Sequence, residues 1–165
     1  YTMPDDMYQR ILKRIQGRGV LTVVDATRDL LVKVLPYHPF LVKPNNHELG
    51  DIFGVKLSTR EEVIPYGKKL QEMGAQNVLI SMAGEGAVLI AADGQSMGAP
   101  APKGTLVNGV GAGDSMVAGF LTGWMEKKDY VHAFHMGIAA GSASAFSENL
   151  ATREEVLQVL QQVEQ

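Results

Sequence analysis

Hydrophobic positions recur along this chain with two different spacings. In several segments apolar residues return every three or four positions, the spacing that gives a helix one buried face. Between those segments lie short uninterrupted apolar runs, which are typical of strands buried on both sides. The first spacing predicts helices over residues 4–17, 29–35, about 45–54, 58–74, 131–146 and 152–163, with a further one that opens at Asp114. The apolar runs predict strands over residues 20–24, 40–42, 78–80 and 87–91.

Local signals indicate where several of these elements begin, turn or pack. Ser58 and Glu61 form a capping box at the start of one helix. The pair Asp93-Gly94 is typical of a two-residue hairpin, so the last strands are expected to run antiparallel at one edge. Small residues four apart form a ridge that permits very close helix packing, namely Ala133, Gly137, Gly141 and Ala145. The methionines expected to fill core space are Met7, Met73, Met82, Met116, Met125 and Met136.

Strands that alternate with helices indicate an α/β fold, an open and mostly parallel sheet with helices on both faces. Ligands of such sheets bind outside the carboxyl ends of the strands. Three loops that leave strands carry polar or glycine-rich sequence, at 43–48, 81–86 and 109–114. We therefore expect these loops to converge on a single site.

Composition and charge narrow the class of protein. With 165 residues, of which 45% are hydrophobic and 20% charged, the chain can form one domain with a substantial core. No apolar run approaches the roughly 20 residues of a membrane helix, so no membrane partner is expected. The net charge of -3 argues against non-specific nucleic-acid binding. The lack of cysteine excludes a disulfide, a thiolate nucleophile and a cysteine-ligated metal, and it is compatible with the cytoplasm, the expected location.

The first residues indicate that the chain is part of a longer protein. It opens with Tyr1-Thr2-Met3-Pro4-Asp5-Asp6, which contains neither an initiator methionine nor a signal sequence. Pro4 and the two acidic residues after it are typical of the first turn of a helix. We therefore expect the chain to begin in the middle of a larger protein.

The stretch 107–120 combines glycines with a carboxylate. Gly109, Gly111 and Gly113 let the backbone turn sharply and bring its N–H groups against a ligand, and the start of the following helix favours an anion. Because a carboxylate repels phosphate, Asp114 makes sense there as a base that takes a proton from a hydroxyl attacking a phosphoryl group. The structural alternative is that Asp is common at helix starts and that Gly-rich turns occur in many α/β proteins. The stretch alone leaves both interpretations open.

Two better-known phosphate loops are excluded. No Gly-Lys-Ser or Gly-Lys-Thr follows a glycine at Walker spacing, and Asp114 replaces the third glycine of a dinucleotide fingerprint. A dinucleotide-dependent oxidoreductase is disfavoured as well, because no Gly-x-Gly-x-x-Gly follows the first strand.

The loop 43–48 offers a charge and two oxygen ligands. Lys43 supplies a positive charge for phosphate, while Asn45 and Glu48 lie one helical turn apart and are able to organise hydrated magnesium together. The alternative is a solvated helix start with Asn45 as its cap. The loop 81–86 carries a weaker signal, a hydroxyl followed by two glycines whose N–H groups can meet a phosphate, although many edge hairpins share it.

The four histidines receive no catalytic role. His132 and His135 are one helical turn apart, but no third ligand is evident, so ordinary packing or surface roles are favoured over a metal. His38 and His47 are single residues in loops or helix starts, and only proximity of His47 to the site is considered.

The run Gly111-Ala112-Gly113-Asp114 resembles the second signature of the ribokinase-like (PfkB) carbohydrate kinases. Lys43-Pro44-Asn45-x-x-Glu48 matches the motif by which that family holds magnesium and nucleotide, and Ser81-x-x-Gly84-x-Gly86-Ala87 is similar to a run that touches its nucleotide. The three motifs occur in the family's order. The family generally has Thr or Ser in place of Gly109 and often Asp in place of Asn108, so the resemblance carries no expectation of the monovalent-cation site that some relatives build there.

The resemblance implies a role for each motif residue. Asp114 is the implied catalytic base, and the implied anion hole consists of Gly111, Ala112 and Gly113. The implied nucleotide contacts are Lys43, Asn45, Ser81, Gly84, Gly86 and Gly113. The implied cofactors are ATP and Mg²⁺, with the metal near Asn45 and Glu48.

Three further runs are similar to the branch of this family that phosphorylates sugar phosphates, at 23–27, 43–49 and 140–145. The reaction this implies is transfer of the ATP γ-phosphoryl group to fructose 1-phosphate, giving fructose 1,6-bisphosphate. Tagatose-6-phosphate kinase is the nearest alternative, and a non-catalytic nucleotide-binding or regulatory domain on the same fold is another.

The resemblance also implies that the chain is a partial domain. Family members are longer, and their first half carries most of the sugar site and a small lid sheet that often forms a dimer interface. Residues 1–165 are therefore expected to be the carboxyl-terminal portion of a PfkB-type kinase, inactive alone. Its implied partners are ATP, a sugar phosphate, the missing amino-terminal half and, through the absent lid, a second copy.

Overall fold

The segments with helical spacing form helices, and most of the apolar runs form strands. A computed structural model of the chain describes residue 4 and residues 6–164, so part of the expected helix start, Tyr1–Met3 and Asp5, lies outside the described residues. The chain divides into two units, one of residues 1–82 with 88–96 and the other of residues 83–87 with 97–165. We call them unit 1 and unit 2 and describe each by itself.

The first part of the chain alternates helices and strands. Its helices are α1 (Met7–Ile15), α2 (Arg28–Val34), α3 (Asn46–Phe53) and α4 (Arg60–Glu72), with 3-10 turns at Leu35–Tyr37 and Ala83–Glu85. Its strands are β1 (Val23–Val24), β2 (Leu41–Val42), β3 (Asn77–Ser81), β4 (Ala87–Ile90) and β5 (Ser96–Ala99). They form one sheet in the order β1-β2-β3-β4-β5, with β1, β2 and β3 parallel.

The hairpin predicted from Asp93-Gly94 is present. Residues 91–95 connect β4 to its sheet neighbour β5, and the N–H of Ala91 donates to the carbonyl of Gln95 at 2.9 Å. A connection this short excludes the crossover that a parallel pair needs. The sheet is therefore mixed, parallel from β1 to β3 and with the predicted antiparallel hairpin at its β5 edge.

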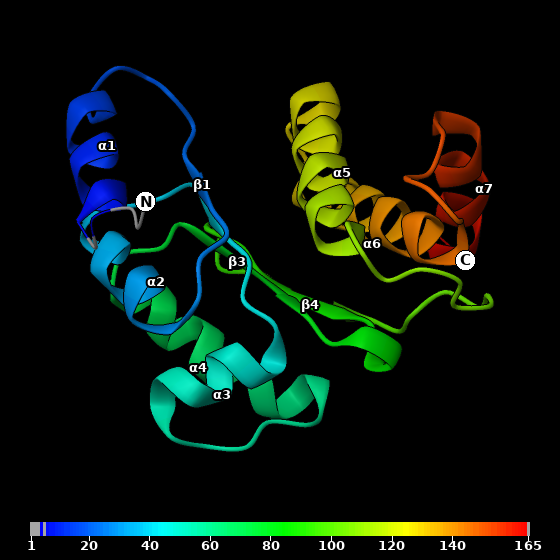
Figure 1. Cartoon of the computed structure of the whole chain (residues 1–165), viewed down its shortest axis with the longest axis horizontal. Helices are drawn as coiled ribbons and strands as arrows, with labels where there is room; N and C mark the ends of the chain where they lie inside the picture. The colour runs from blue at the N-terminus through cyan, green and yellow to red at the C-terminus, as the bar shows by residue number, and fades with distance from the viewer. Residues whose placement is uncertain (1–3, 5, 165) are drawn as a thin grey trace. The chain divides into compact units, whose positions relative to one another are not determined.

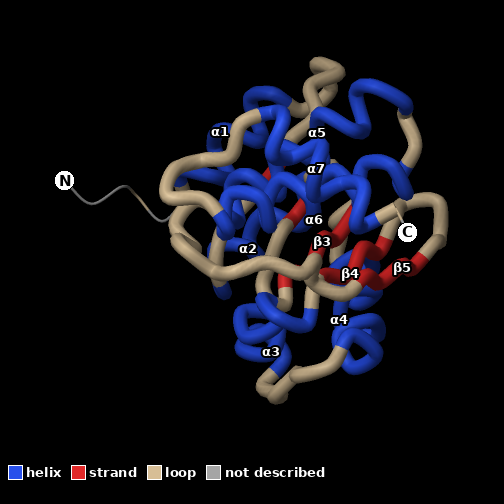
Figure 2. Tube along the Cα trace, turned by 90° about the vertical axis from the view of Figure 1, so that its right-hand side faces the viewer, coloured by secondary structure: helices blue, strands red, loops and turns tan. Residues whose placement is uncertain are grey.

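The core of unit 1 lies between the sheet and its helices. Alternate strand residues Val42, Val78, Ile80, Val88 and Ile90 form one cluster with buried side chains of α1 to α4. The intervening residues Leu41, Leu79 and Leu89 are also fully buried, which explains why the strands are continuous apolar runs. α3 and α4 lie side by side (Figures 1 and 2).

The predicted strand at 20–24 is wrong in its first half. β1 begins only at Val23, and Val20 and Leu21 are 57% and 49% exposed. The apolar pattern is the same in the residues that lead to the strand and in the strand itself, so it does not show where the strand begins. The pairing with β2 does, and it starts with Val23 opposite Leu41.

The predicted capping box at the start of α4 is displaced by one residue. Thr59, not Ser58, is the N-cap, and its hydroxyl accepts from the N–H of Glu62, not Glu61. The carboxylate of Glu62 accepts in return from the N–H groups of Ser58 and Thr59. Both registers satisfy the sequence pattern, so only the structure decides between them.

Unit 2 consists largely of three helices packed side by side (Figure 1), α5 (Ala112–Lys127), α6 (Tyr130–Phe146) and α7 (Arg153–Val163). The predicted small-residue ridge lies in the contact between α5 and α6. A Cβ added at Gly141 would lie only 3.1 Å from both the Ala112 carbonyl oxygen and the Met116 Cβ atom. The ridge thus brings α6 close to the first turn of α5, as predicted.

The methionines divide between core and surface. Met82 and Met136 are buried and Met7 and Met116 half-buried, but Met73 and Met125 are 38% and 70% exposed, so the prediction that they fill core space is wrong for those two. In the part of the chain that the structure describes, no helix has the length and hydropathy needed to cross a membrane.

Candidate functional site

Lys43 lies at the carboxyl end of β2, where its side chain is largely enclosed. The ammonium group is 3.3 Å from the carboxylate of Asp25, which follows β1, and the Lys43 side chain is only 9% exposed. Burying a lysine charge is costly unless it is paired, and the carboxylate of Asp25 provides that partner. Sequence analysis gave Asp25 no role; the available signal was its position directly after a strand, at the edge of the sheet where ligands bind.

Asn45 and Glu48 form a reciprocal capping box at the start of α3. The Asn45 side-chain oxygen accepts from the N–H of Glu48 at 2.8 Å, and Glu48 Oε2 accepts from the N–H of Asn45 at 2.9 Å. The predicted helix cap is therefore present. Each side chain uses one oxygen in the cap, so Oε1 of Glu48 stays available to another partner.

The metal role predicted for Asn45 and Glu48 stays a prediction. Among the described residues, no group of three or more His, Asp and Glu side chains could hold a metal ion. Magnesium is commonly held by one or two carboxylates, several waters and the phosphates of its nucleotide. A carboxylate and an amide oxygen one turn apart fit that mode of binding, although they do not form a metal cage.

Ser81 lies beside the loop 43–48. Its N–H donates to the carbonyl of Pro44 at 3.2 Å, and Asn45 and Ser81 form a parallel β-bridge beyond the last paired residues of β2 and β3. The loop 43–48 and the first residue of the loop 81–86 thus come together within unit 1, with Lys43, Asn45 and Ser81 at the same edge of the sheet.

Gly84 and Gly86 differ in what the structure requires of them. Gly86 has a φ of +94°, and a Cβ there would collide with the backbone of Ala99 to Ala101, so glycine is structurally necessary. At Gly84 nothing lies within 4 Å of an added Cβ, and its backbone is exposed. Gly84 therefore fits the predicted contact with a ligand better than Gly86, whose role is explained by packing alone.

The loop 109–114 ends in the first turn of α5. Gly111 is the N-cap with a φ of +79°, where a side chain would be strained. Ala112 N–H donates to the Gly109 carbonyl at 3.3 Å and Ser115 N–H to the Gly111 carbonyl at 2.9 Å. For the N–H groups of Gly113 and Asp114 the described part of the chain provides no acceptor.

These free groups lie at the positive end of the α5 dipole and are available to an anion. The side chain of Asp114 is exposed to solvent beside them. This combination of free donors and a carboxylate is what the pattern of the loop predicted.

The predicted convergence of all three loops on one site involves both units and stays a prediction. Lys43, Asn45, Glu48 and Ser81 belong to unit 1, whereas Gly84, Gly86 and the loop 109–114 belong to unit 2.

The histidines take structural positions. His132 pairs with Glu126 at 3.2 Å, and His38 contacts the Gly74 carbonyl at 3.0 Å through Nδ1. The contact of His132 agrees with the packing or surface role favoured for that residue, whereas no role was predicted for His38.

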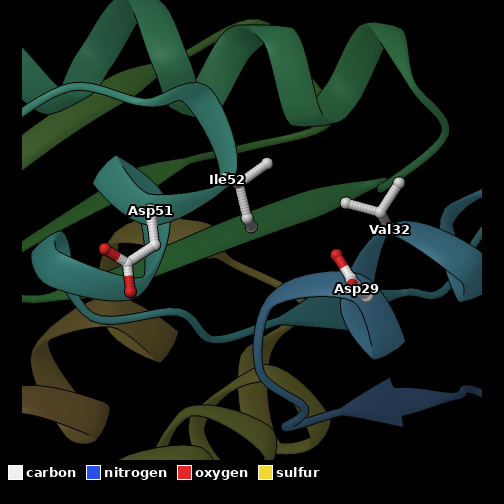
Figure 3. A pocket seen from close by; sticks show the side chains of 4 residues that line it. All are labelled: Asp29, Val32, Asp51 and Ile52. Carbon is white, nitrogen blue, oxygen red and sulfur yellow. The ribbon is translucent and has the colours of Figure 1, made fainter.

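A pocket of about 410 Å³ opens between α2 and α3, lined by Asp29, Val32, Asp51 and Ile52 (Figure 3). Its two carboxylates would repel a phosphate, and no residue that the sequence singled out lines it. This pocket is therefore not the candidate site.

The comparisons with known proteins identify the family. The model of the pfkB family carbohydrate kinases matches residues 2–156. The chain belongs to this family. This pfkB-family chain is 46% identical over 162 residues to a 1-phosphofructokinase from Bacillus subtilis, covering 98% of the chain and 53% of the relative. It is 34% identical over 163 residues to a D-tagatose-1-phosphate kinase from Bacillus licheniformis, again covering 98% of the chain and 53% of the relative.

The solved structures agree on the fold of this pfkB-family chain. A crystal structure of a Staphylococcus aureus protein, 39% identical, matches with a TM-score of 0.91 and covers 98% of this chain and 53% of its own. The fold is the ribokinase-like α/β fold that the motifs implied. The chain spans about half the length of the curated relatives it matches.

Proposed function

We propose that this chain is the nucleotide-binding and catalytic part of an ATP-dependent sugar-phosphate kinase. The observation that carries the proposal is the start of α5, where the N–H groups of Gly113 and Asp114 lack an acceptor among the described residues and the Asp114 carboxylate is exposed beside them. A structural helix cap would use that carboxylate to satisfy the free N–H groups. Here neither the N-cap Gly111 nor Asp114 does so, which leaves both the donors and the base available to a substrate.

Asp114 and its loop have complementary roles in this proposal. Asp114 accepts the proton of the sugar hydroxyl as that oxygen attacks the γ-phosphorus of ATP, and ADP leaves. In this proposal the N–H groups of Gly111, Ala112 and Gly113 stabilise the negative charge that develops on the transferred group, and the Ala112 N–H would exchange its bond to the Gly109 carbonyl for one to that group. Because these donors belong to the backbone of one helix start, they need little reorganisation during the reaction.

The residues of unit 1 are suited to the nucleotide and its metal. Lys43 supplies a charge for the polyphosphate. Glu48 would hold Mg²⁺ through Oε1, which the capping box leaves free, and Asn45 through the second lone pair of its one side-chain oxygen. The metal, when bound, would neutralise phosphate charge. Ser81 and the exposed backbone of Gly84 offer further donors to the nucleotide, and Gly86 shapes their loop.

The acceptor that the relatives support best is fructose 1-phosphate, phosphorylated to fructose 1,6-bisphosphate, since the relative at 46% identity is named 1-phosphofructokinase. A second candidate follows from the relative at 34% identity, which is named D-tagatose-1-phosphate kinase. Both names indicate an acceptor that carries phosphate on C1. For that reason we propose D-tagatose 1-phosphate, in place of tagatose 6-phosphate, as the alternative acceptor.

The proposal includes partners beyond the substrates. The chain spans about half of its relatives' length, and we propose that it acts joined to an amino-terminal half that supplies most of the sugar site. We call that assembly the complete kinase. A dimer through the lid of that half and a cytoplasmic location belong to the same proposal.

The decisive experiment replaces Asp114 by Asn in the complete kinase. Asn keeps the size and an oxygen but cannot accept a proton, so kcat should fall about 100- to 10,000-fold while ATP affinity stays equal or improves. If Asp114 were only a favourable charge at a helix start, the variant would lose about 0.3 to 1 kcal/mol of stability and turn over normally.

Calorimetry with ATP and magnesium and a coupled assay for ADP release should be run on one preparation. Normal turnover with intact ATP binding would eliminate Asp114 as the base. It would favour the competing assignment, a nucleotide-binding or regulatory domain without catalysis.

A further inference from the structure

We propose that the hydroxyl of Ser144 is a positioning group for Asp114, acting through the hydroxyl of Ser115. The inference rests on the proposed function, because it concerns how the base and the anion-binding N–H groups are held. Ser144 lies in α6 and Ser115 directly follows Asp114 in α5, and the sequence predicted no role for either hydroxyl.

The two hydroxyl groups form a directed chain. Ser144 Oγ donates to Ser115 Oγ at 2.8 Å and accepts from the N–H of Ala151 at 3.1 Å. Ser144 is only 3% exposed, one of the few buried polar residues among those the structure describes. A buried hydroxyl that both donates and accepts is fixed in direction, since no water competes for it.

Together with the close packing of α6 on α5, this bond sets the rotation of the first turn of α5 about the helix axis. Successive residues of a helix are separated by about 100° around the axis, so a contact at Ser115 determines where the Asp114 side chain points. Ser115 faces α6, and Asp114 therefore points away from that contact toward solvent, where it is exposed. The same rotation sets the directions of the free N–H groups of Gly113 and Asp114.

The segment after Ser144 holds the rest of the loop as well. The Ala145 carbonyl accepts from the N–H groups of Val107 and Asn108, at 2.9 and 3.1 Å. The Asn108 side chain donates to the Glu148 carbonyl at 3.2 Å. A single chain segment thus touches both ends of the loop, and Ser144 is its contact with the helix that carries the base.

Ser144 is not needed to bind substrates in this proposal, so its loss should affect kcat more than KM. One hydrogen bond of this kind contributes enough free energy that Ser144→Ala should lower kcat about threefold to tenfold. The KM values for ATP and for the sugar phosphate should change less than about twofold, because the side chain touches neither substrate.

The test compares five variants of the complete kinase by kcat, both KM values and melting temperature. They are Ser144→Ala, Ser115→Ala, Ser115→Thr, the double variant Ser115→Ala with Ser144→Ala, and the control Ser142→Ala. Ser142 lies in the same helix and forms no hydrogen bond with its side chain among the described residues, so its variant should keep the kcat of the unmodified enzyme.

Two further results are expected if the hydroxyls act as one unit. Ser115→Thr should restore the kcat lost in Ser115→Ala, because threonine retains the acceptor. The double variant should be no slower than Ser144→Ala alone, because both changes remove the same bond.

The inference is overturned if Ser144→Ala keeps the kcat of Ser142→Ala while melting earlier, which would indicate a role in stability only. It is also overturned if the kcat of Ser115→Thr is as low as that of Ser115→Ala. If Ser144→Ala does not fold, the comparison of these two Ser115 variants is the test. The variant Asp114→Asn distinguishes a failure of the proposed function from a failure of the positioning role. A normal kcat in that variant refutes the proposed function, whereas a slow Asp114→Asn with a normal Ser144→Ala refutes only the positioning role.

Discussion

The carboxylate of Glu48 shows how one side chain can serve a helix cap and a ligand at once. Its Oε2 atom closes the capping box with Asn45, so the presence of Glu48 at this position is explained without any ligand. Lys43 has no comparable structural explanation. Burying an ammonium group whose ion-pair partner is one half-exposed carboxylate costs folding free energy, which favours a functional role for the charge of Lys43.

The charges of this loop can be tested one at a time. Glu48→Gln keeps a side-chain oxygen for the capping box and removes only the negative charge, and Lys43→Ala removes the positive charge. We expect ATP binding to require magnesium and each variant to weaken it about tenfold or more, as for the loss of a contact with a charged group.

Calorimetry on the isolated chain, with ATP and magnesium, measures the affinity of each of the two variants for ATP. The matched controls are Asp51→Asn, the same change of charge on the same helix, and Lys56→Ala, an exposed lysine outside the loop. Equal affinities in the two test variants and the two controls would remove the loop 43–48 from the nucleotide site.

Helix α7 begins with a capping box that gives part of the stability a dependence on pH. The Glu155 carboxylate accepts from the N–H of Thr152 at 2.7 Å and from its hydroxyl at 2.9 Å, and the Thr152 hydroxyl is also within 3.4 Å of the Glu155 N–H. These bonds favour the ionised form and lower the pKa of Glu155 below its ordinary value of 4.5. Since the folded pKa is depressed, the stabilisation is present above the unfolded pKa and is lost as the pH falls through the folded one.

We therefore expect acidification from pH 5 to below the ordinary pKa of about 4.5 to lower the melting temperature less steeply in Glu155→Gln than in the unmodified chain. Thermal unfolding followed by circular dichroism at several pH values measures the slope. Glu154→Gln, one residue earlier and outside the capping box, is the control and should keep the original slope. An unchanged slope in Glu155→Gln would mean that the cap contributes nothing to acid sensitivity.

At the scale of the whole molecule, the chain spans about half the length of the curated relatives it matches. Phosphoryl transfer requires the acceptor hydroxyl to be held in line with the γ-phosphorus, and much of the rate of such enzymes comes from that orientation. If most of the sugar site belongs to an amino-terminal half, this chain can bind nucleotide but cannot orient the acceptor.

We expect the isolated chain to turn over fructose 1-phosphate at a rate at least about 1,000-fold below that of the complete kinase. A coupled assay for ADP release, with fructose 1-phosphate and D-tagatose 1-phosphate as acceptors, measures both preparations. Calorimetry on the same isolated chain shows whether it still binds ATP. Full activity from residues 1–165 alone would mean that the sugar site lies within this chain.

The sequence by itself determined the order of elements, the mixed sheet and the family, because these depend on local periodicity, turn residues and motifs that are contiguous in the chain. It also singled out Asp114 and the loop 43–48 as candidates from the chemistry of their residue types, and their roles stay predictions. It did not place the N-cap of α4 at Thr59 or the start of β1 at Val23. The first depends on which of two overlapping capping patterns forms its hydrogen bonds, and the second on where pairing with β2 begins. Only the tertiary structure decided the contacts between distant segments, Asp25 with Lys43 and Ser144 with Ser115. Such pairs leave no periodic signal, because their partners are brought together by packing of the elements that carry them.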